Sequence, residues 1–156
     1  MKISKMFSLV FLTVYPHQGL AADFVEMPLI SAKDLQVEMQ AQTGQSVKGN
    51  NRRKFYKNQN LLVINVLSPS ICSDCHIPGS INVPLHTLTK KSQDWRKDAN
   101  IVLHCASLHC PLSRYAFEML SKLGFTRIRV FDGGLQEWTA EKFPRVGRCR
   151  AGYLRF

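Results

Sequence analysis

Three short apolar runs alternate with segments of helical periodicity along this chain of 156 residues. The runs cover residues 61–67 (LLVINVL), 101–103 and 127–131. Each has the length of a strand, and the first is a nearly unbroken apolar run, which is typical of strands buried on both faces of a parallel sheet. The alternation predicts an α/β domain with a mainly parallel sheet flanked by helices.

Cys105 lies where the second apolar run stops, so its sulfur is expected at the carboxyl end of a strand. Open parallel sheets bind their ligands beyond this end of the strands. From Pro111 to Gly124 apolar residues recur at helical spacing, so the thiol faces the start of a helix, which favours the thiolate. These residues alone leave two interpretations open, a reactive nucleophile and a buried core cysteine.

The composition is that of a globular protein, with 45% hydrophobic and 21% charged residues, and the length fits one domain. The formal net charge of +10 is unusually positive. Such a charge attracts small anions, acidic proteins or nucleic acid. The chain has no nucleic-acid-binding motif, so we expect no nucleic-acid partner.

The first 22 residues have the pattern of a secretory signal peptide. Lys2 and Lys5 precede an apolar stretch, 6–15, that is too short to span a bilayer, and small residues follow at 19–22. We therefore expect cleavage, a periplasmic or secreted protein, and no stable membrane insertion afterwards. An uncleaved anchor helix is the alternative. Export would bring the five cysteines into an oxidising compartment.

The mature chain is expected to form one domain with three parts. Residues 23–60 are predicted to hold an N-terminal arm, a helix and a basic loop, 61–145 the core, and 146–156 a basic tail. Ser31 is the predicted N-cap of the first helix, with Asp34 three residues later completing a variant of the capping box.

Three motifs follow one another along the predicted core. They are residues 76–84 (HIPGSINVP), Cys105, and residues 132–138 (DGGLQEW). Together they resemble the rhodanese-like family, which carries a segment of the type GHIPGAINIP, then a catalytic cysteine after a later strand, then Gly-Gly and a helix with Trp. The resemblance covers about residues 30–143 and implies a rhodanese-like fold and sulfurtransferase activity without a cofactor.

The chain departs from the family pattern at several positions. Asn65 stands where Asp is usual, Leu67 where Arg is usual, and Cys75 where Gly precedes the histidine. Aligning Ser113 with the family's serine also places it two residues further from Cys105 than in the common loop.

The resemblance implies that the Cys105 thiolate takes the outer sulfur of a donor such as thiosulfate, holds it as a persulfide, and passes it to a thiol or cyanide-like acceptor. The backbone N–H groups of the following loop are expected to surround the sulfur. These residues are Ala106, Ser107, Leu108, His109 and Cys110. Arg114 and His109 are candidates for binding the anionic end of the donor. The expected partners are this small anionic donor and an acidic or thiol-bearing protein acceptor.

A non-catalytic module that senses redox state or binds a partner is the alternative function. A phosphatase is not expected, because Pro111 stands where the related phosphatase loop has its arginine.

The remaining cysteines leave several interpretations open. Cys110 could be a resolving thiol, a persulfide acceptor or a residue of the helix start. Cys72 and Cys75 are expected to form a disulfide or a free pair with a possible redox role. With His76 they also match the pattern for covalent haem attachment, but His76 already belongs to the motif at 76–84, so neither haem nor a metal is expected.

Overall fold

The computed structural model describes residues 26–42, 60–150 and 152, and within them it forms a four-stranded sheet. The strands are β1 (Leu62–Asn65), β2 (Ile81–Asn82), β3 (Ile101–His104) and β4 (Ile128–Phe131). Their order is β2-β1-β3-β4 and every pairing is parallel, with Val63 opposite Val102 and Leu103 opposite Val130. The predicted parallel α/β sheet is confirmed. The predicted signal peptide, nearly all of the basic loop, and residues 151 and 153–156 of the tail lie outside the described residues.

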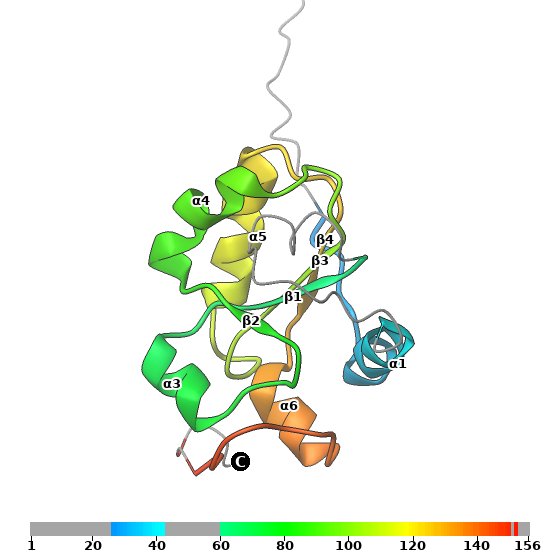
Figure 1. The fold of residues 1–156 in the computed structure, drawn as a ribbon, viewed down its shortest axis with the longest axis vertical. Helices are drawn as coiled ribbons and strands as arrows, with labels where there is room; N and C mark the ends of the chain where they lie inside the picture. Colours follow the sequence, from blue (N-terminus) through cyan, green and yellow to red (C-terminus); the bar gives the residue numbers. More distant parts are fainter. Residues whose placement is uncertain (1–25, 43–59, 151, 153–156) are drawn as a thin grey trace, which may run out of the picture.

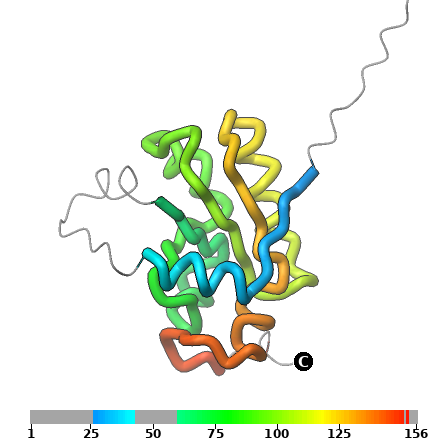
Figure 2. The backbone as a smooth tube through the Cα atoms, turned by 90° about the vertical axis from the view of Figure 1, so that its right-hand side faces the viewer, coloured from blue at the N-terminus to red at the C-terminus, as the bar shows by residue number. Residues whose placement is uncertain are grey.

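The helices surround this sheet on both faces and at one end (Figures 1 and 2). They are α1 (Ala32–Gln42), α3 (Pro69–Asp74), α4 (Leu88–Lys91), α5 (Leu112–Lys122) and α6 (Gly134–Ala140), and short 3-10 turns, Leu85–Thr87 and Ser92–Asp94, flank α4. Helices α4 and α5 lie on one side of the sheet and α1 on the other. Helices α3 and α6 lie at the end where the strands stop. No helix in the described ranges is long and apolar enough to cross a bilayer.

The central strands are buried along their whole length, as their apolar sequences predict. The predicted first strand is shorter than expected because Asn65 ends it with a local turn, in which the Leu67 backbone N–H donates to Asn65 Oδ1 at 3.0 Å. Asn82 Nδ2 holds the same turn from the neighbouring strand by donating to the carbonyls of Asn65 and Leu67. This turn directs the chain into α3.

The predicted start of α1 and the predicted start and end of α5 are confirmed. In front of α1, the Asp34 backbone N–H donates to Ser31 Oγ at 3.1 Å, and the Ser31 hydroxyl donates to the Asp34 carboxylate. Helix α5 follows Pro111, which is tolerated there because the first N–H groups of a helix need no partner within it. After α5, Gly124 adopts φ +82°, a conformation that favours glycine and turns the chain away from the helix.

Two short segments without a periodic sequence pattern pack against the domain, one beside the sheet and one across the loops at its end. Residues 28–30 run beside β4, with Ile30 N donating to Val130 O at 3.0 Å and Val130 N to Pro28 O at 2.9 Å. The segment from Pro144 to Arg150 crosses the end of the molecule from α6 to α3 (Figure 1). The start of the predicted tail is therefore packed against the domain.

Candidate active site

Cys105 follows β3 directly and is completely buried at the carboxyl end of the sheet. A loop of six residues, 106–111, leads from it to the first residue of α5, Leu112. The sheet is parallel, so the loops after β1, β3 and β4 all emerge at this same end. The strand, loop and helix expected around the thiol are confirmed, and the cysteine lies where a parallel sheet places reactive groups.

The N-terminus of α6 holds the start of this loop in place. Leu135 N donates to Cys105 O at 3.1 Å, and Gln136 N donates to Ala106 O at 2.8 Å. Gly134 makes this approach possible, since it adopts φ +58° and a Cβ atom there would lie 2.5 Å from Cys105 O. The motif at 132–138 thus positions the cysteine through backbone contacts, a role that the sequence alone does not assign to Gly134.

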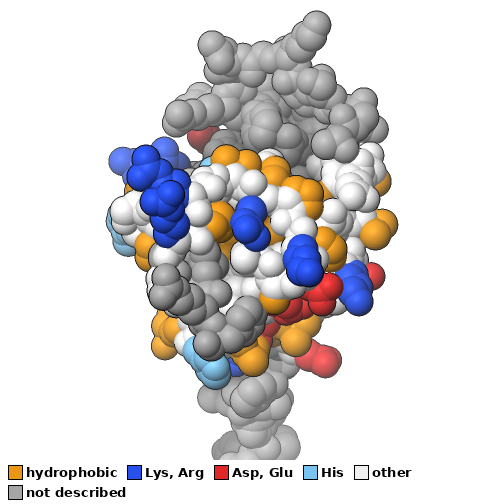
Figure 3. Space-filling view, turned by 90° about the horizontal axis from the view of Figure 1, so that it is seen from below, with side chains coloured by type: hydrophobic (Ala, Val, Ile, Leu, Met, Phe, Trp, Pro, Cys, Tyr) orange, Lys and Arg blue, Asp and Glu red, His pale blue; other side chains and the backbone are white. Residues whose placement is uncertain are grey.

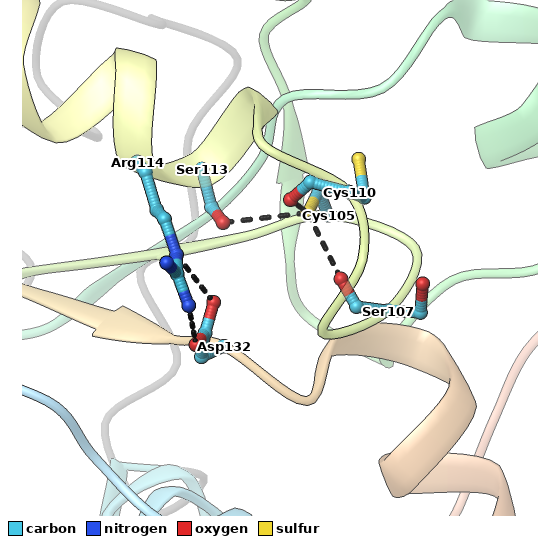
Figure 4. Close-up of polar contacts among 6 residues, drawn as sticks. All are labelled: Cys105, Ser107, Cys110, Ser113, Arg114 and Asp132. Carbon is cyan, nitrogen blue, oxygen red and sulfur yellow. Dashed lines mark hydrogen bonds and ion pairs between the residues drawn. The ribbon is translucent and has the colours of Figure 1, made fainter.

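The Cys105 sulfur is surrounded by oxygen atoms (Figure 4). Its nearest polar contacts are the Cys110 carbonyl oxygen at 3.0 Å, Ser113 Oγ at 3.3 Å and the Ser107 carbonyl oxygen at 3.8 Å. The expectation that N–H groups of residues 106–110 surround the sulfur stays a prediction, because in this conformation Ser107 and Cys110 direct their carbonyl groups toward it. The Cys110 N–H is used within the loop, where it donates to Ser107 O at 2.9 Å.

This environment favours the protonated thiol. Burial raises the pKa of the Cys105 thiol to about 11, and the adjacent Cys110 side chain adds to the rise. The hydroxyl and the backbone N–H of Ser113 act in the opposite direction and lower the pKa. The helix start therefore does stabilise the thiolate through Ser113, but the loss of solvation outweighs it.

Arg114, a candidate for binding the donor, is paired with Asp132 in this structure. Its Nε donates to Asp132 Oδ1 at 3.2 Å and its Nη2 to the other carboxylate oxygen, so the two side chains form a bidentate pair between α5 and the end of β4 (Figure 4). Asp132 raises the pKa of the Arg114 guanidinium. His109 and Leu108 lie exposed in the loop, and their predicted contacts with a substrate stay predictions.

Both expectations for Cys72 and Cys75, a disulfide between them or a free pair, are wrong, because Cys75 forms a disulfide with Cys149, 74 residues later. Cys72 is free and partly buried on α3, and burial raises the pKa of its thiol. Spacing alone could not identify this partner, because residues 146–150 have no periodic pattern that places them against α3.

Backbone hydrogen bonds fix the same segment. His76 and Val146 exchange two of them, His76 N to Val146 O at 3.0 Å and Val146 N to His76 O at 2.9 Å, and Cys149 N donates to Asp74 O at 2.8 Å. The disulfide thus belongs to a clamp, residues 144–150, that closes over the loop following β1. Within the described ranges, no three His, Cys, Asp or Glu side chains form a group that could hold a metal ion.

His104 is a buried group that the sequence patterns do not identify. Its side chain is fully buried, and burial lowers its pKa to about 4. Nδ1 lies 3.4 Å from the Cys105 carbonyl oxygen, whereas Nε2 has no hydrogen-bond partner among the described residues. The nearby His76 lowers the pKa of His104 further, so the imidazole is neutral at neutral pH.

Fold and site together define a parallel α/β domain with a buried cysteine in a loop between a strand and a helix. The family model for the Rhodanese-like domain matches residues 51–141, and the chain belongs to this family. This family, together with the similarity to a sulfurtransferase, indicates a protein of sulfurtransferase type.

Three relatives illustrate the range of similarity. A sulfurtransferase of Allochromatium vinosum is 24% identical over 88 residues, covering 56% of this chain and 80% of that protein. The HTH-type transcriptional regulator Rv0324 of Mycobacterium tuberculosis is 29% identical over 69 residues, or 44% of this chain, and the chain spans only 30% of that regulator's length. A rhodanese-related protein of Thermoplasma volcanium superposes with a TM-score of 0.57 and 27% identity, covering 76% of this chain and 97% of that one.

Proposed function

We propose that this protein is a sulfurtransferase in which Cys105 carries sulfane sulfur as a persulfide. The observation that carries the proposal is the position of Cys105, at the carboxyl end of β3 and 3.3 Å from the hydroxyl of Ser113 at the helix start. Family membership and the similarity to a sulfurtransferase support it.

The chemistry proceeds in two halves. The Cys105 thiolate attacks the outer sulfur of a donor such as thiosulfate, the sulfur–sulfur bond of the donor breaks, and sulfite leaves with the bonding electrons. The persulfide then gives its outer sulfur to a thiol or cyanide-like acceptor. Because burial raises the pKa of Cys105 to about 11, only a small fraction of the thiol is ionised at pH 7, so the rate of the first half should rise with pH.

Positive charge at the active-site end supports an anionic donor and an acidic acceptor as partners. The clamp and its flank carry four exposed cations, Lys142, Arg145, Arg148 and Arg150. Figure 3 shows Lys and Arg side chains spread over this face, with Asp and Glu side chains gathered toward one edge of it. Such a surface raises the local concentration of anions and speeds their encounter with the site. Arg114 would contribute to donor binding if the donor displaced it from Asp132.

An oxidising compartment is part of the proposal. The signal-peptide pattern at 1–22 supports export to the periplasm or the medium, and the disulfide between Cys75 and Cys149 fits such a compartment. Protein isolated from the periplasm of its host should begin near Ala22 or Asp23. Full-length chain in the cytosol would contradict export.

A non-catalytic module is the second candidate, and the complete burial of Cys105 is the observation that favours it. Sulfite release after treatment with thiosulfate separates the two candidates. Reduced protein should release about one equivalent of sulfite as sulfur is transferred to Cys105, and Cys105→Ser should release none, since a serine hydroxyl cannot hold a persulfide. A wild-type protein that releases no sulfite even at pH 9 would establish the non-catalytic alternative.

A further inference from the structure

Cys110 is a second free thiol in the loop that holds Cys105. The loop folds back on itself through the hydrogen bond from Cys110 N to Ser107 O, and this turn brings the Cys110 carbonyl oxygen to 3.0 Å from the Cys105 sulfur. Standard bond lengths then place the Cα atom of Cys110 at most about 6 Å from that sulfur. Figure 4 draws the two cysteines beside each other at the start of α5.

This arrangement brings the backbone of Cys110 next to the Cys105 sulfur. A disulfide between the two residues requires in addition that the Cys110 side chain turn toward that sulfur, with the two Cα atoms about 4.4–6.8 Å apart. The Cys110 side chain is only partly buried, and it interacts with the Cys105 thiol, whose pKa it raises. The other cysteines of the described part are placed elsewhere, since Cys75 is bonded to Cys149 and Cys72 lies on α3. Cys110 is therefore the thiol placed to react with a sulfur atom held on Cys105.

We propose that Cys110 resolves the Cys105 persulfide and thereby releases hydrosulfide. The Cys110 thiolate attacks the sulfur of Cys105, the bond between this atom and the outer sulfur breaks, and the outer sulfur leaves with the bonding electrons. A disulfide between Cys105 and Cys110 remains. This inference rests on the proposed function and makes the protein a reductive sulfurtransferase that needs no separate acceptor for one turnover.

Atoms and electrons balance over this turnover. Thiosulfate and two thiols give sulfite, hydrogen sulfide and one disulfide. The outer sulfur of thiosulfate is reduced by two electrons, which the two cysteines supply, and the protons of the two thiols leave with the sulfide. A further turnover requires a dithiol, either a small molecule such as dithiothreitol or a protein dithiol, to reduce the new disulfide.

The experiment is a single turnover of the full chain without added acceptor. Fully folded protein with Cys105 and Cys110 reduced is freed of reductant and mixed with one equivalent of thiosulfate, and sulfide, sulfite and intact mass are followed over time. Wild-type protein should release about one equivalent each of sulfite and sulfide and lose two hydrogen atoms. A peptide map without reduction should then show Cys105 joined to Cys110.

The matched variants are Cys110→Ser and Cys72→Ser, which each replace one free cysteine. Cys110→Ser should release sulfite, keep one extra sulfur on Cys105 at least tenfold longer than the wild type, and form no sulfide. Cys110→Ala should behave in the same way, which separates loss of the thiol from a folding defect. Cys72→Ser should match the wild type.

Two other outcomes overturn the inference in different ways. A wild-type persulfide as long-lived as that of Cys110→Ser, with no sulfide, would refute resolution by Cys110 and leave the sulfurtransferase proposal standing. No sulfur on Cys105 in Cys110→Ser and no sulfite from any variant would refute both proposals together.

Discussion

The first prediction concerns Ser113, whose hydroxyl should increase the reactivity of Cys105 by lowering the pKa of its thiol. The Ser113 side chain is buried at the start of α5, with Oγ 3.3 Å from the sulfur, and both its hydroxyl and its backbone N–H lower the pKa of the thiol. Ser113→Ala removes the hydroxyl and leaves the backbone N–H in place. A hydrogen bond to a charged group contributes about 1.5–3 kcal/mol, so the thiolate should become about ten- to a hundredfold rarer at any pH below the pKa.

Alkylation kinetics measure this fraction directly, because iodoacetamide reacts with the thiolate and not with the thiol. In a Cys72→Ser/Cys110→Ser background with the Cys75–Cys149 disulfide intact, Cys105 is the remaining free cysteine of the chain. Loss of the Cys110 side chain lowers the pKa of Cys105 somewhat, but burial, the largest cause of the raised pKa, remains. The parent rate should therefore still climb about tenfold per pH unit from pH 7 upward, without a plateau by pH 8. Ser113→Ala should lower the rate about ten- to a hundredfold across that range.

Ser121→Ala is the matched control, because it removes a hydroxyl from the last part of the same helix, away from the thiol. It should leave the alkylation rate unchanged. A Ser113→Ala protein that reacts as fast as its parent would show that the Ser113 hydroxyl does not stabilise the thiolate. A parent rate that levels off by pH 8 would show that burial does not raise the pKa of Cys105.

Three further predictions concern the surroundings of the site. The pKa of His104 is about 4 in the folded protein and near 6.5 in the unfolded chain, so between these pH values the unfolded chain binds more protons. The free energy of unfolding, measured by urea denaturation, should therefore fall as the pH is lowered from 6.5 to 4. His104→Gln should flatten this slope. Gly134→Ala should destabilise the fold by about 3 kcal/mol or more, as measured by chemical denaturation, because its Cβ atom would collide with the loop backbone. Gly124 is also at positive φ but has open space around it, so Gly124→Ala should cost only about 1 kcal/mol. Cys149→Ser should lower the free energy of unfolding by about 4 kcal/mol because it opens a long covalent loop, while Cys72→Ser should change it by less than about 1 kcal/mol.

The sheet and the position of the thiol could be predicted because they depend on local patterns. The apolar runs at 61–67 and 101–103 need burial on both faces, and only a parallel sheet covered by helices supplies it. Cys105 then follows from where its run ends. Likewise Ser31 and Asp34 form their capping pair within four residues, so no distant contact has to be known.

The parts that could not be predicted depend on contacts between distant segments or on loop conformation. The partner of Cys75 lies 74 residues away in a segment without periodicity. Helix α3 has only six residues, too few for a periodic pattern to predict it, and Ser68 and Pro69 are its N-cap and first residue only in the structure. The backbone conformation of residues 106–111 determines whether N–H or C=O groups face the Cys105 sulfur, and no local sequence pattern predicts that conformation.

The last prediction concerns the order in which a dithiol would reduce the two disulfides of a protein that has completed one turnover. Reduction requires a thiolate to reach one of the bonded sulfur atoms. Each disulfide would join a completely buried cysteine, Cys105 or Cys75, to a partly buried one, Cys110 or Cys149. The difference lies in the clamp, which backbone hydrogen bonds between His76 and Val146 and from Cys149 N to Asp74 O also hold closed over Cys75. We therefore expect low concentrations of dithiothreitol to regenerate Cys105 and Cys110 while Cys75–Cys149 persists, as differential alkylation followed by peptide mapping would show. Reduction of Cys75–Cys149 first would contradict this expectation and would mean that the clamp opens more readily than the loop. A dithiol that regenerates Cys105 and Cys110 would then also break the disulfide that holds the clamp.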